Sequence, residues 1–334
     1  MLKIWKGRVK EGENCTLWLK ERKKMGFKYL FGPVPSRRLG LSLGVDLVPY
    51  KVCSYDCLYC EVGPTTMKTV DRKEYVPLQE VKKELEAFIT SNMETDFITF
   101  SGFGEPTLHS GIGELISWIR ERSTVPIAVL TNGSLLKDER VRRDLMGAHV
   151  VLPSLDAGTP KTFKIINRPH KSITLEDVVE GLEVFTKEFP GEVWLEILLV
   201  KGINDTPQEL EALAELVKKI APDRVQLNTV VRPPAHGGKP LSLEEMERIL
   251  PLFGPKAEVV AYPTEKKAKG REDLMNAIVE TVARRPCSQE DIAKVVGVNP
   301  LEVVKYIGEL LEEGRLEVVK YNNKTFYKAS HSKE

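Results

Sequence analysis

Residues 43–60 read LGVDLVPYKVCSYDCLYC, and this stretch decides the fold class. It begins as a short apolar strand and ends in a loop that carries Cys53, Cys57 and Cys60. Three thiols in eight residues are too few and too close for a closed four-cysteine zinc site, unless a fourth ligand comes from elsewhere in the chain. The spacing suits three corners of a cuboidal iron–sulfur cluster that leaves one iron open.

A zinc site completed by a distant ligand, such as His109 or Cys287, is the alternative. The chain has five cysteines, and an odd number with three crowded together makes a poor disulfide framework. In a reducing compartment such a group of thiols is typical of metal binding or catalysis. Cys15 and Cys287 are expected to be free thiols.

Apolar runs typical of buried strands alternate with segments of helical periodicity along most of the chain. The predicted strands are residues 43–48, 97–100, 127–130, 150–152, 193–200, 225–228 and 259–261. The predicted helices are residues 78–89, 112–122, 139–146, 175–189, 207–220 and 242–252. This alternation predicts an α/β fold, a partial (βα)6 barrel, with the chemistry at the carboxyl ends of the strands.

The cysteine spacing, with Tyr59 directly before the third cysteine, resembles the signature of the radical S-adenosylmethionine (radical SAM) superfamily. The resemblance implies a 4Fe–4S cluster held by Cys53, Cys57 and Cys60, with SAM chelating the open iron. It also implies that one electron cleaves the sulfonium to a 5′-deoxyadenosyl radical, which abstracts hydrogen from an unactivated substrate carbon. A barrel lumen would shield that radical from water.

Residues 101–108, which follow the second strand, resemble the Gly-Gly-Glu segment that lines the methionine amino group in this superfamily. The match rests on Gly104 and Glu105, because Phe103 is inserted between the two glycines. Glycine lets the main chain approach a ligand closely, and acceptor groups suit an ammonium. The alternative is an ordinary glycine-rich turn.

Polar residues also follow the third and fourth strands. By resemblance, Asn132, Ser154 and Asp156 are expected to contact ribose or carboxylate groups of SAM. Arg168 is expected to neutralise the methionyl carboxylate through a charge-assisted pair. The alternatives are a simple turn at Asn132 and a surface cation at Arg168.

Further polar side chains on the later strands are candidate substrate contacts, with ordinary loop polar groups as the alternative. They are Glu196, Gln226, Asn228 and Arg232. Residues 31–40 form a proline-restricted segment that is expected near the barrel mouth, where Arg37 and Arg38 could bind phosphate or remain solvated. Together with residues 60–65, this segment resembles poorly characterised radical SAM proteins, described as iron–sulfur oxidoreductases and distantly similar to tRNA wyosine-base synthases.

The predicted organisation has four parts: a basic arm at 1–28, the barrel at 29–265, a linker at 266–270 and a C-terminal domain at 271–330. Met25 directly precedes the start of globular patterning and is a candidate start of translation. The C-terminal part shows three helical segments and a hairpin, and so resembles a winged helix-turn-helix domain. From residue 271 onward it carries ten basic and eleven acidic residues, which argues against an ordinary DNA-binding surface.

The 334 residues carry 49 Lys and Arg against 48 Asp and Glu, and 42% of them are hydrophobic. This composition excludes disordered and collagen-like classes, and the near-zero net charge argues against a protein that binds polyanions over its whole surface. No apolar run approaches the roughly 18 residues that a membrane span needs, so a cytoplasmic location is expected.

The resemblance implies an electron donor such as ferredoxin or flavodoxin. A modified RNA base, a peptide and a small metabolite all fit a partial barrel as substrates, and the basic arm, Arg37 and Arg38, and the hairpin favour RNA. The rival function is a winged-helix transcription regulator that senses metal or redox state. The acidic predicted helix at 300–313 counts against it, because DNA phosphates repel acidic residues.

Overall fold

The computed structural model describes residues 27–91, 93–261, 271–283, 285–296, 300–322 and 324–330. It forms two compact units, a larger one from residue 27 to 264 with residues 320–324, and a smaller one that contains most of the C-terminal part. Most of the predicted basic arm, with Met25, and the whole predicted linker lie outside the described residues.

One eight-stranded sheet forms the body of the larger unit, in the order β1-β2-β5-β6-β7-β8-β9-β10. All neighbouring strands pair in parallel except β1 and β2, which are antiparallel. Its strands are β1 (Leu30–Ser36), β2 (Gly40–Val45), β5 (Phe97–Phe100), β6 (Ile127–Thr131), β7 (Val150–Pro153), β8 (Glu192–Leu199), β9 (Arg224–Thr229) and β10 (Ala257–Val259). A separate two-stranded sheet joins β3 (Val52–Cys53) to β4 (Met67–Lys68).

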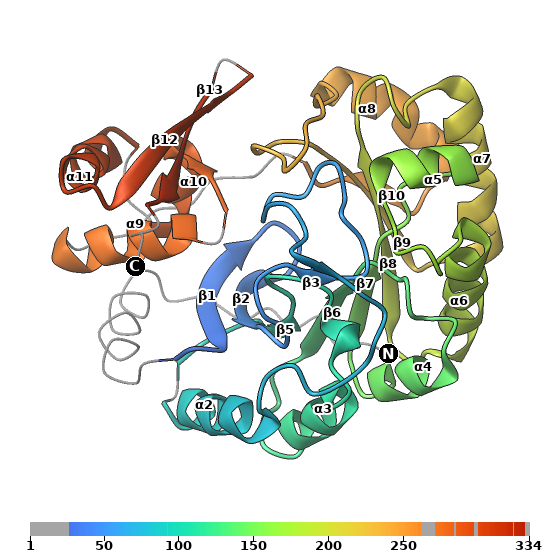
Figure 1. Cartoon of the computed structure of the whole chain (residues 1–334), viewed down its shortest axis with the longest axis horizontal. Coiled ribbons are helices and arrows are strands. Elements are labelled where there is room, and N and C mark those ends of the chain that lie inside the picture. The colour runs from blue at the N-terminus through green and yellow to red at the C-terminus, as the bar shows by residue number, and fades with distance from the viewer. Residues whose placement is uncertain are drawn as a thin grey trace. The chain divides into compact units, whose positions relative to one another are not determined.

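Helices cover the outer side of this sheet (Figure 1). They are α2 (Leu78–Thr90), α3 (Ile112–Arg120), α4 (Glu139–Leu145), α5 (Pro160–Ile166), α6 (Leu175–Glu188), α7 (Pro207–Ile220) and α8 (Leu243–Ile249), with short 3₁₀ turns η1 (Pro106–Leu108) and η2 (Leu250–Phe253). The predicted alternation of strands and helices is confirmed to within a few residues, and α5 is an additional helix. The arrangement is the expected α/β fold with a largely parallel sheet.

Residues 31–40 do not form the proline-restricted segment that was predicted near the barrel mouth. These residues form β1 and a tight turn that leads into β2, so the backbone of Arg37 and Arg38 lies at the amino edge of the parallel sheet. Their guanidinium groups extend from there to Ala261 and Glu196. The cysteine loop leaves the opposite edge, after β2. Pro33 and Pro35 fit within β1 because it is an edge strand, where a missing N–H donor disrupts no central ladder.

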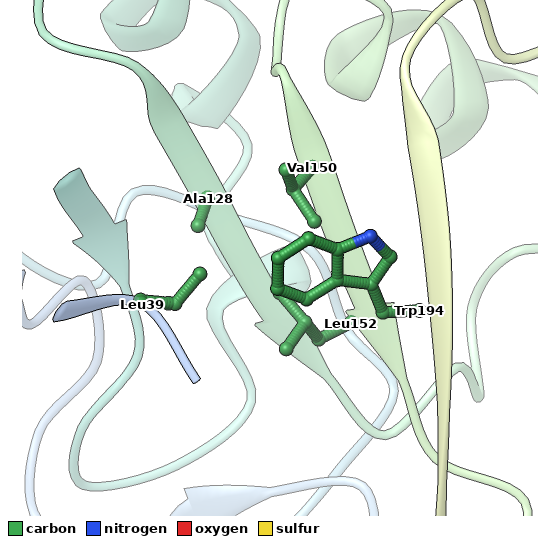
Figure 2. Close-up of a cluster of buried hydrophobic side chains, with 5 residues drawn as sticks. All are labelled: Leu39, Ala128, Val150, Leu152 and Trp194. Carbon is green, nitrogen blue, oxygen red and sulfur yellow. The ribbon is translucent and has the colours of Figure 1, made fainter. Parts of the chain in front are cut away.

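An apolar cluster on the inner face of the sheet closes this end of the lumen. Leu39 from the turn packs against Ala128 of β6, Val150 and Leu152 of β7, and Trp194 of β8 (Figure 2). In Figure 2 these side chains point toward one another from three strands and the turn. Space near the amino edge is therefore taken by the chain itself.

A polar network lies beside this cluster, and it engages residues predicted as substrate contacts. Arg38 Nη1 lies 2.8 Å from Glu196 Oε2, and Asn228 Nδ2 donates to Glu196 Oε1 at 2.8 Å. Arg37 Nη1 donates to the carbonyl of Ala261 at 2.7 Å. Ala261 follows β10, so this bond joins the turn after one edge strand, β1, to the end of the other edge strand, β10. Burial alone would raise the pKa of Glu196, but Arg38 and the Asn228 amide lower it below its usual 4.5.

We expect Glu196→Gln to lower the free energy of unfolding of the larger unit by about 3 kcal/mol, because it leaves the largely buried Arg38 cation without its carboxylate. Since the folded-state pKa of Glu196 is lowered, this stabilisation is present above pH 4.5 and is lost as the pH falls through the folded-state value. Urea unfolding of wild type and variant at pH 7 measures the loss of stability. The same comparison at pH 4 measures how much of that stabilisation depends on pH. Glu215→Gln, in an exposed pair with Lys218, is the control and should change nothing measurable. A variant as stable as wild type at pH 7 would contradict the assignment.

The smaller unit contains α9 (Arg271–Ala283), β11 (Cys287–Ser288), α10 (Gln289–Val296), α11 (Pro300–Glu312), β12 (Leu316–Tyr321) and β13 (Lys324–Ala329). Its three strands form a sheet in the order β11-β13-β12, and its core includes Ile278, Ile292, Val303, Leu310 and Phe326. Three helices and a hairpin are thus present as predicted. Among the described residues of the whole chain, no helix is long and apolar enough to cross a membrane.

Candidate metal and cofactor site

The loop with the three cysteines leaves the carboxyl edge of β2 and rests on the end of α5. The amide of Leu58 donates to the carbonyl of Ile166 at 2.8 Å, and the amide of Asp56 donates to that of Asn167 at 3.2 Å. Within the loop, the amide of Cys60 donates to the carbonyl of Cys57 at 3.2 Å. All three cysteines are free thiols and half-buried.

Each of the three sulfurs accepts an N–H donor from a side chain, and these donors come from three separate segments. They are Asn132 Nδ2 to Cys53 Sγ at 3.6 Å, Asn167 Nδ2 to Cys57 Sγ at 3.7 Å and Lys51 Nζ to Cys60 Sγ at 3.0 Å. Sulfur ligands of iron–sulfur clusters commonly accept such bonds, and these bonds tune the reduction potential. Lys51 and Asn167 were not predicted from the sequence, since nothing in it shows that they meet the cysteines.

The three N–H donors around the sulfurs suit a negatively charged group. Lys51 is only 3% exposed, and no carboxylate of the described residues lies within ion-pair distance of it. A buried ammonium is unfavourable unless an anion compensates it, and three cysteine thiolates would do so. Burial lowers the pKa of Lys51, but Cys60 and Cys53 outweigh this and raise it above 10.5.

Burial raises the pKa of two of the thiols, those of Cys53 and Cys57. Burial raises the pKa of Cys53 to about 11, with Glu105 adding to the effect. Metal coordination is what deprotonates such a thiol. In the parts of the chain that the structure describes, no three His, Cys, Asp or Glu side chains are grouped to hold a single metal ion.

The alternative zinc ligands are occupied elsewhere. His109 is fully buried in the larger unit, where Nε2 lies 2.9 Å from the carbonyl of Val76 and Nδ1 accepts from the amide of Gly111 at 3.0 Å. Both ring nitrogens are therefore used. Cys287 is buried in the smaller unit, where its thiol donates to the carbonyl of Thr281.

Glu105 lies close to the site and is bonded to groups of the chain itself, and its predicted contact with a ligand ammonium stays a prediction. Its carboxylate is 2% exposed and accepts from the amide and hydroxyl of Thr107, the hydroxyl of Thr131 and the amide of Asn132, at 2.6–3.0 Å. Glu105 positions Asn132, whose amide group reaches Cys53.

The glycines before Glu105 are required by contacts within the chain. A Cβ on Gly104 would lie 1.9 Å from the carbonyl oxygen of Val52, at the start of the cysteine loop. Gly102 has φ +122°, and a Cβ there would lie 1.5 Å from Asp46 Oδ1. The two glycines therefore let the second βα loop pack directly on the first, whatever else they contact.

Asp156 holds the cysteine loop from the other side. Its Oδ2 accepts from the hydroxyl of Tyr59 at 2.5 Å and from Asn167 Nδ2 at 2.7 Å, and its Oδ1 accepts from the amide of Leu198 at 2.9 Å. Burial raises the pKa of Asp156 to about 6, although all three donors oppose the shift. Tyr59 and Asp156, both predicted as cofactor contacts, are thus bonded to each other.

We expect Asp156→Asn to lower the metal affinity of the cysteine loop by about 10-fold to 100-fold, because an amide replaces an acceptor that supports both Tyr59 and Asn167. Anaerobic titration of the full chain with ferrous iron measures this effect. Glu211→Gln, at an exposed position of α7, is the control. An affinity within twofold of wild type for Asp156→Asn would show that this support is unimportant.

Ser154 and Arg168 lie at the same edge of the sheet. Ser154 follows β7 and pairs with the backbone of Glu196. The Arg168 side chain is 41% exposed, and its Nη1 lies 3.7 Å from Asp56 Oδ2. Its partner in the structure is thus the cysteine loop, and its contact with a ligand carboxylate stays a prediction.

The segment after β9 also fastens the cysteine loop. The amides of residues 235–236 donate to the carbonyls of Cys60 and Leu58 at 2.9 and 3.0 Å. Arg232 Nη1 lies 3.1 Å from Glu61 Oε2, so this predicted substrate contact is paired with the loop. Five segments of the chain therefore converge on the cysteine loop at the carboxyl edge of the sheet: the Gly104 loop, the Asn132 loop, Asp156, the end of α5 and the segment after β9.

Comparison with known proteins agrees with this geometry. A family model described as the radical SAM superfamily matches residues 47–217, which include the three cysteines and every predicted cofactor contact. The chain belongs to the radical SAM superfamily. Members of this superfamily are enzymes whose cofactors are a 4Fe–4S cluster and SAM, and Cys53, Cys57 and Cys60 are the residues here that suit the cluster.

Two curated relatives and one solved structure are similar to this radical SAM chain. UPF0026 protein MJ1312 of Methanocaldococcus jannaschii is 35% identical over 316 residues, covering 89% of this chain and 94% of the relative. A protein named GTPase Obg from Brachyspira hyodysenteriae is 39% identical over 306 residues, but this chain spans only 44% of its length. A radical SAM methyltransferase from Sphaerobacter thermophilus shares 20% identity over 65% of this chain and 66% of its own, with a TM-score of 0.49.

Proposed function

We propose that this protein cleaves SAM reductively at a 4Fe–4S cluster held by Cys53, Cys57 and Cys60, and uses the resulting radical to abstract hydrogen from a substrate. The observation that carries the proposal is the convergence of three thiols, each with its own N–H donor, at the carboxyl edge of a largely parallel sheet. When bound, the cluster and SAM supply one-electron cleavage of the sulfonium bond to methionine and a 5′-deoxyadenosyl radical. The electron comes from an external reductant such as ferredoxin or flavodoxin.

The chain's own residues hold this site together and fill the amino end of the sheet's inner face. Glu105 and Asp156 are buried carboxylates that position Asn132, Tyr59 and Asn167 around the cysteine loop. At the far end of the lumen, Leu39 and the apolar cluster around it exclude solvent. A reactive radical is protected best in a chamber closed on that side.

The experiment is anaerobic reconstitution of the full chain with iron and sulfide, followed by SAM and a strong reductant. We expect about four irons per chain. We also expect 5′-deoxyadenosine to form only when the reductant is present. A colourless protein that retains zinc and forms no nucleoside after strictly anaerobic work would overturn the proposal.

For the substrate, we propose an RNA base. Support comes from the nine basic residues among positions 1–28 and from Lys320, Lys324 and Lys328 in the hairpin. Arg37 does not support RNA binding, because its side chain donates to the carbonyl of Ala261. Crosslinking of the full chain to cellular RNA tests this step, and recovery of no RNA above background would contradict it.

We also propose that the smaller unit is a winged-helix domain that docks the substrate. Its helices α9, α10 and α11, followed by the β12–β13 hairpin, occur in the order that such a domain requires. The charge of α11 disfavours DNA binding, because this helix carries acidic residues at 302, 309 and 312 against a single lysine at 305.

A further inference from the structure

We propose that Lys51 is a positioning residue of the cysteine site whose ammonium group partners the iron–sulfur cluster and favours its reduced state. The inference rests on the proposed function, because it concerns the cluster that the three cysteines would hold. It assigns a role to a residue outside the cysteine motif.

The main chain is pinned so that the Lys51 side chain points at the sulfurs. Its amide donates to the carbonyl of Phe103 at 3.0 Å, and its carbonyl accepts from the amides of Thr66 and Met67 at 3.1 and 3.2 Å. Lys51 also has φ +56°, a left-handed conformation that is unfavourable for lysine. The surrounding bonds thus enforce a strained backbone at a position that delivers Nζ to within 3.0 Å of Cys60 Sγ.

In the described structure no carboxylate lies within ion-pair distance of Lys51, so the cysteine sulfurs are the groups that face its ammonium. The side chain is 3% exposed, and its one side-chain hydrogen bond goes to Cys60. The other two sulfurs accept from the neutral amides of Asn132 and Asn167. Lys51 therefore contributes the single full positive charge among the three donors.

A fixed cation changes the balance between two redox states of a neighbouring anion. The reduced cluster carries one more negative charge than the oxidised cluster, so a nearby ammonium stabilises the reduced state more strongly. This difference is large where water is largely excluded, because the effective dielectric constant is low. Removing the charge should therefore make the cluster harder to reduce.

The test is a potentiometric titration of the reconstituted full chain, followed by electron paramagnetic resonance and carried out without SAM. At the wild-type midpoint potential, we expect Lys51→Met to lower the ratio of reduced to oxidised cluster roughly tenfold, which corresponds to about 59 mV for one electron. Lys51→Arg, which keeps the charge, should stay closer to wild type. Lys68→Met is the matched control, because Lys68 is an exposed lysine on the neighbouring strand β4 and should titrate as wild type does. A Lys51→Met ratio within twofold of wild type would overturn the inference.

A second measurement decides the question if the Lys51 variants fail to fold or to hold iron. Wild-type protein with ¹⁵N at lysine Nζ should show a weak nitrogen coupling to the reduced cluster in pulsed resonance spectra. That coupling should persist in Lys68→Met. If the labelled wild type shows no coupling, the inference is wrong. If wild type holds no four-iron cluster at all, it is the proposed function that fails.

Discussion

Cys57→Ala should abolish iron binding and the formation of 5′-deoxyadenosine together. The loss is complete rather than partial because three thiolates are the whole protein ligand set of the proposed cluster, and two of them do not hold it. The same outcome is expected for Cys53→Ala and Cys60→Ala. Iron and sulfide content, from about four of each per chain to near zero, and nucleoside chromatography are the two measurements.

Cys287→Ser is the matched control for the cysteine variants. Its thiol lies in the smaller unit and donates to the carbonyl of Thr281, a bond that a serine hydroxyl can also make. We expect unchanged iron content and unchanged nucleoside formation. A cluster that survives the loss of Cys57 would show that the ligands have been wrongly assigned.

Gly104→Ala should remove the cluster without touching a ligand. The added Cβ would lie 1.9 Å from the carbonyl oxygen of Val52 and 2.8 Å from a methyl group of Val48, so the backbone before Cys53 must move. Overpacking of this kind costs about 3 kcal/mol. Urea unfolding should show that loss, and reconstitution should give a chain with little iron.

The control for this variant is another glycine with free space around it. Gly308 lies within α11, and a Cβ there would meet nothing within 4 Å. Gly308→Ala should stabilise the smaller unit by about 1 kcal/mol, because alanine is more favourable than glycine inside a helix. Full iron content in Gly104→Ala would show that the close approach of the two loops is not needed.

The strands and the outer helices were predictable because each depends on local pattern. Residues 207–220, for example, show helical periodicity, and they form α7 within the predicted bounds. The prediction for Cys53, Cys57 and Cys60 rests on their spacing. Local patterns of this kind predict structure well when the tertiary contacts of the fold agree with them.

The remainder of the site depends on contacts between distant residues. Asn167 is 110 positions from Cys57, and no local feature shows that its amide donates to that sulfur. Arg37 and Arg38 were placed near the mouth because proline suggested a loop, whereas β1 is an edge strand that tolerates it. The four donors around the Glu105 carboxylate come from Thr107, Thr131 and Asn132, and the sequence does not show that the last two meet it. Residue type alone could not separate these outcomes.

The most direct test of the account asks whether SAM binds to an iron of the cluster. The resonance spectrum of the reduced cluster is recorded with and without SAM that carries ¹⁷O in its carboxylate. We predict that SAM changes the spectrum and that the ¹⁷O nucleus couples to it, because three cysteines leave one iron free. Identical spectra, with no coupling to the label, would contradict the central claim.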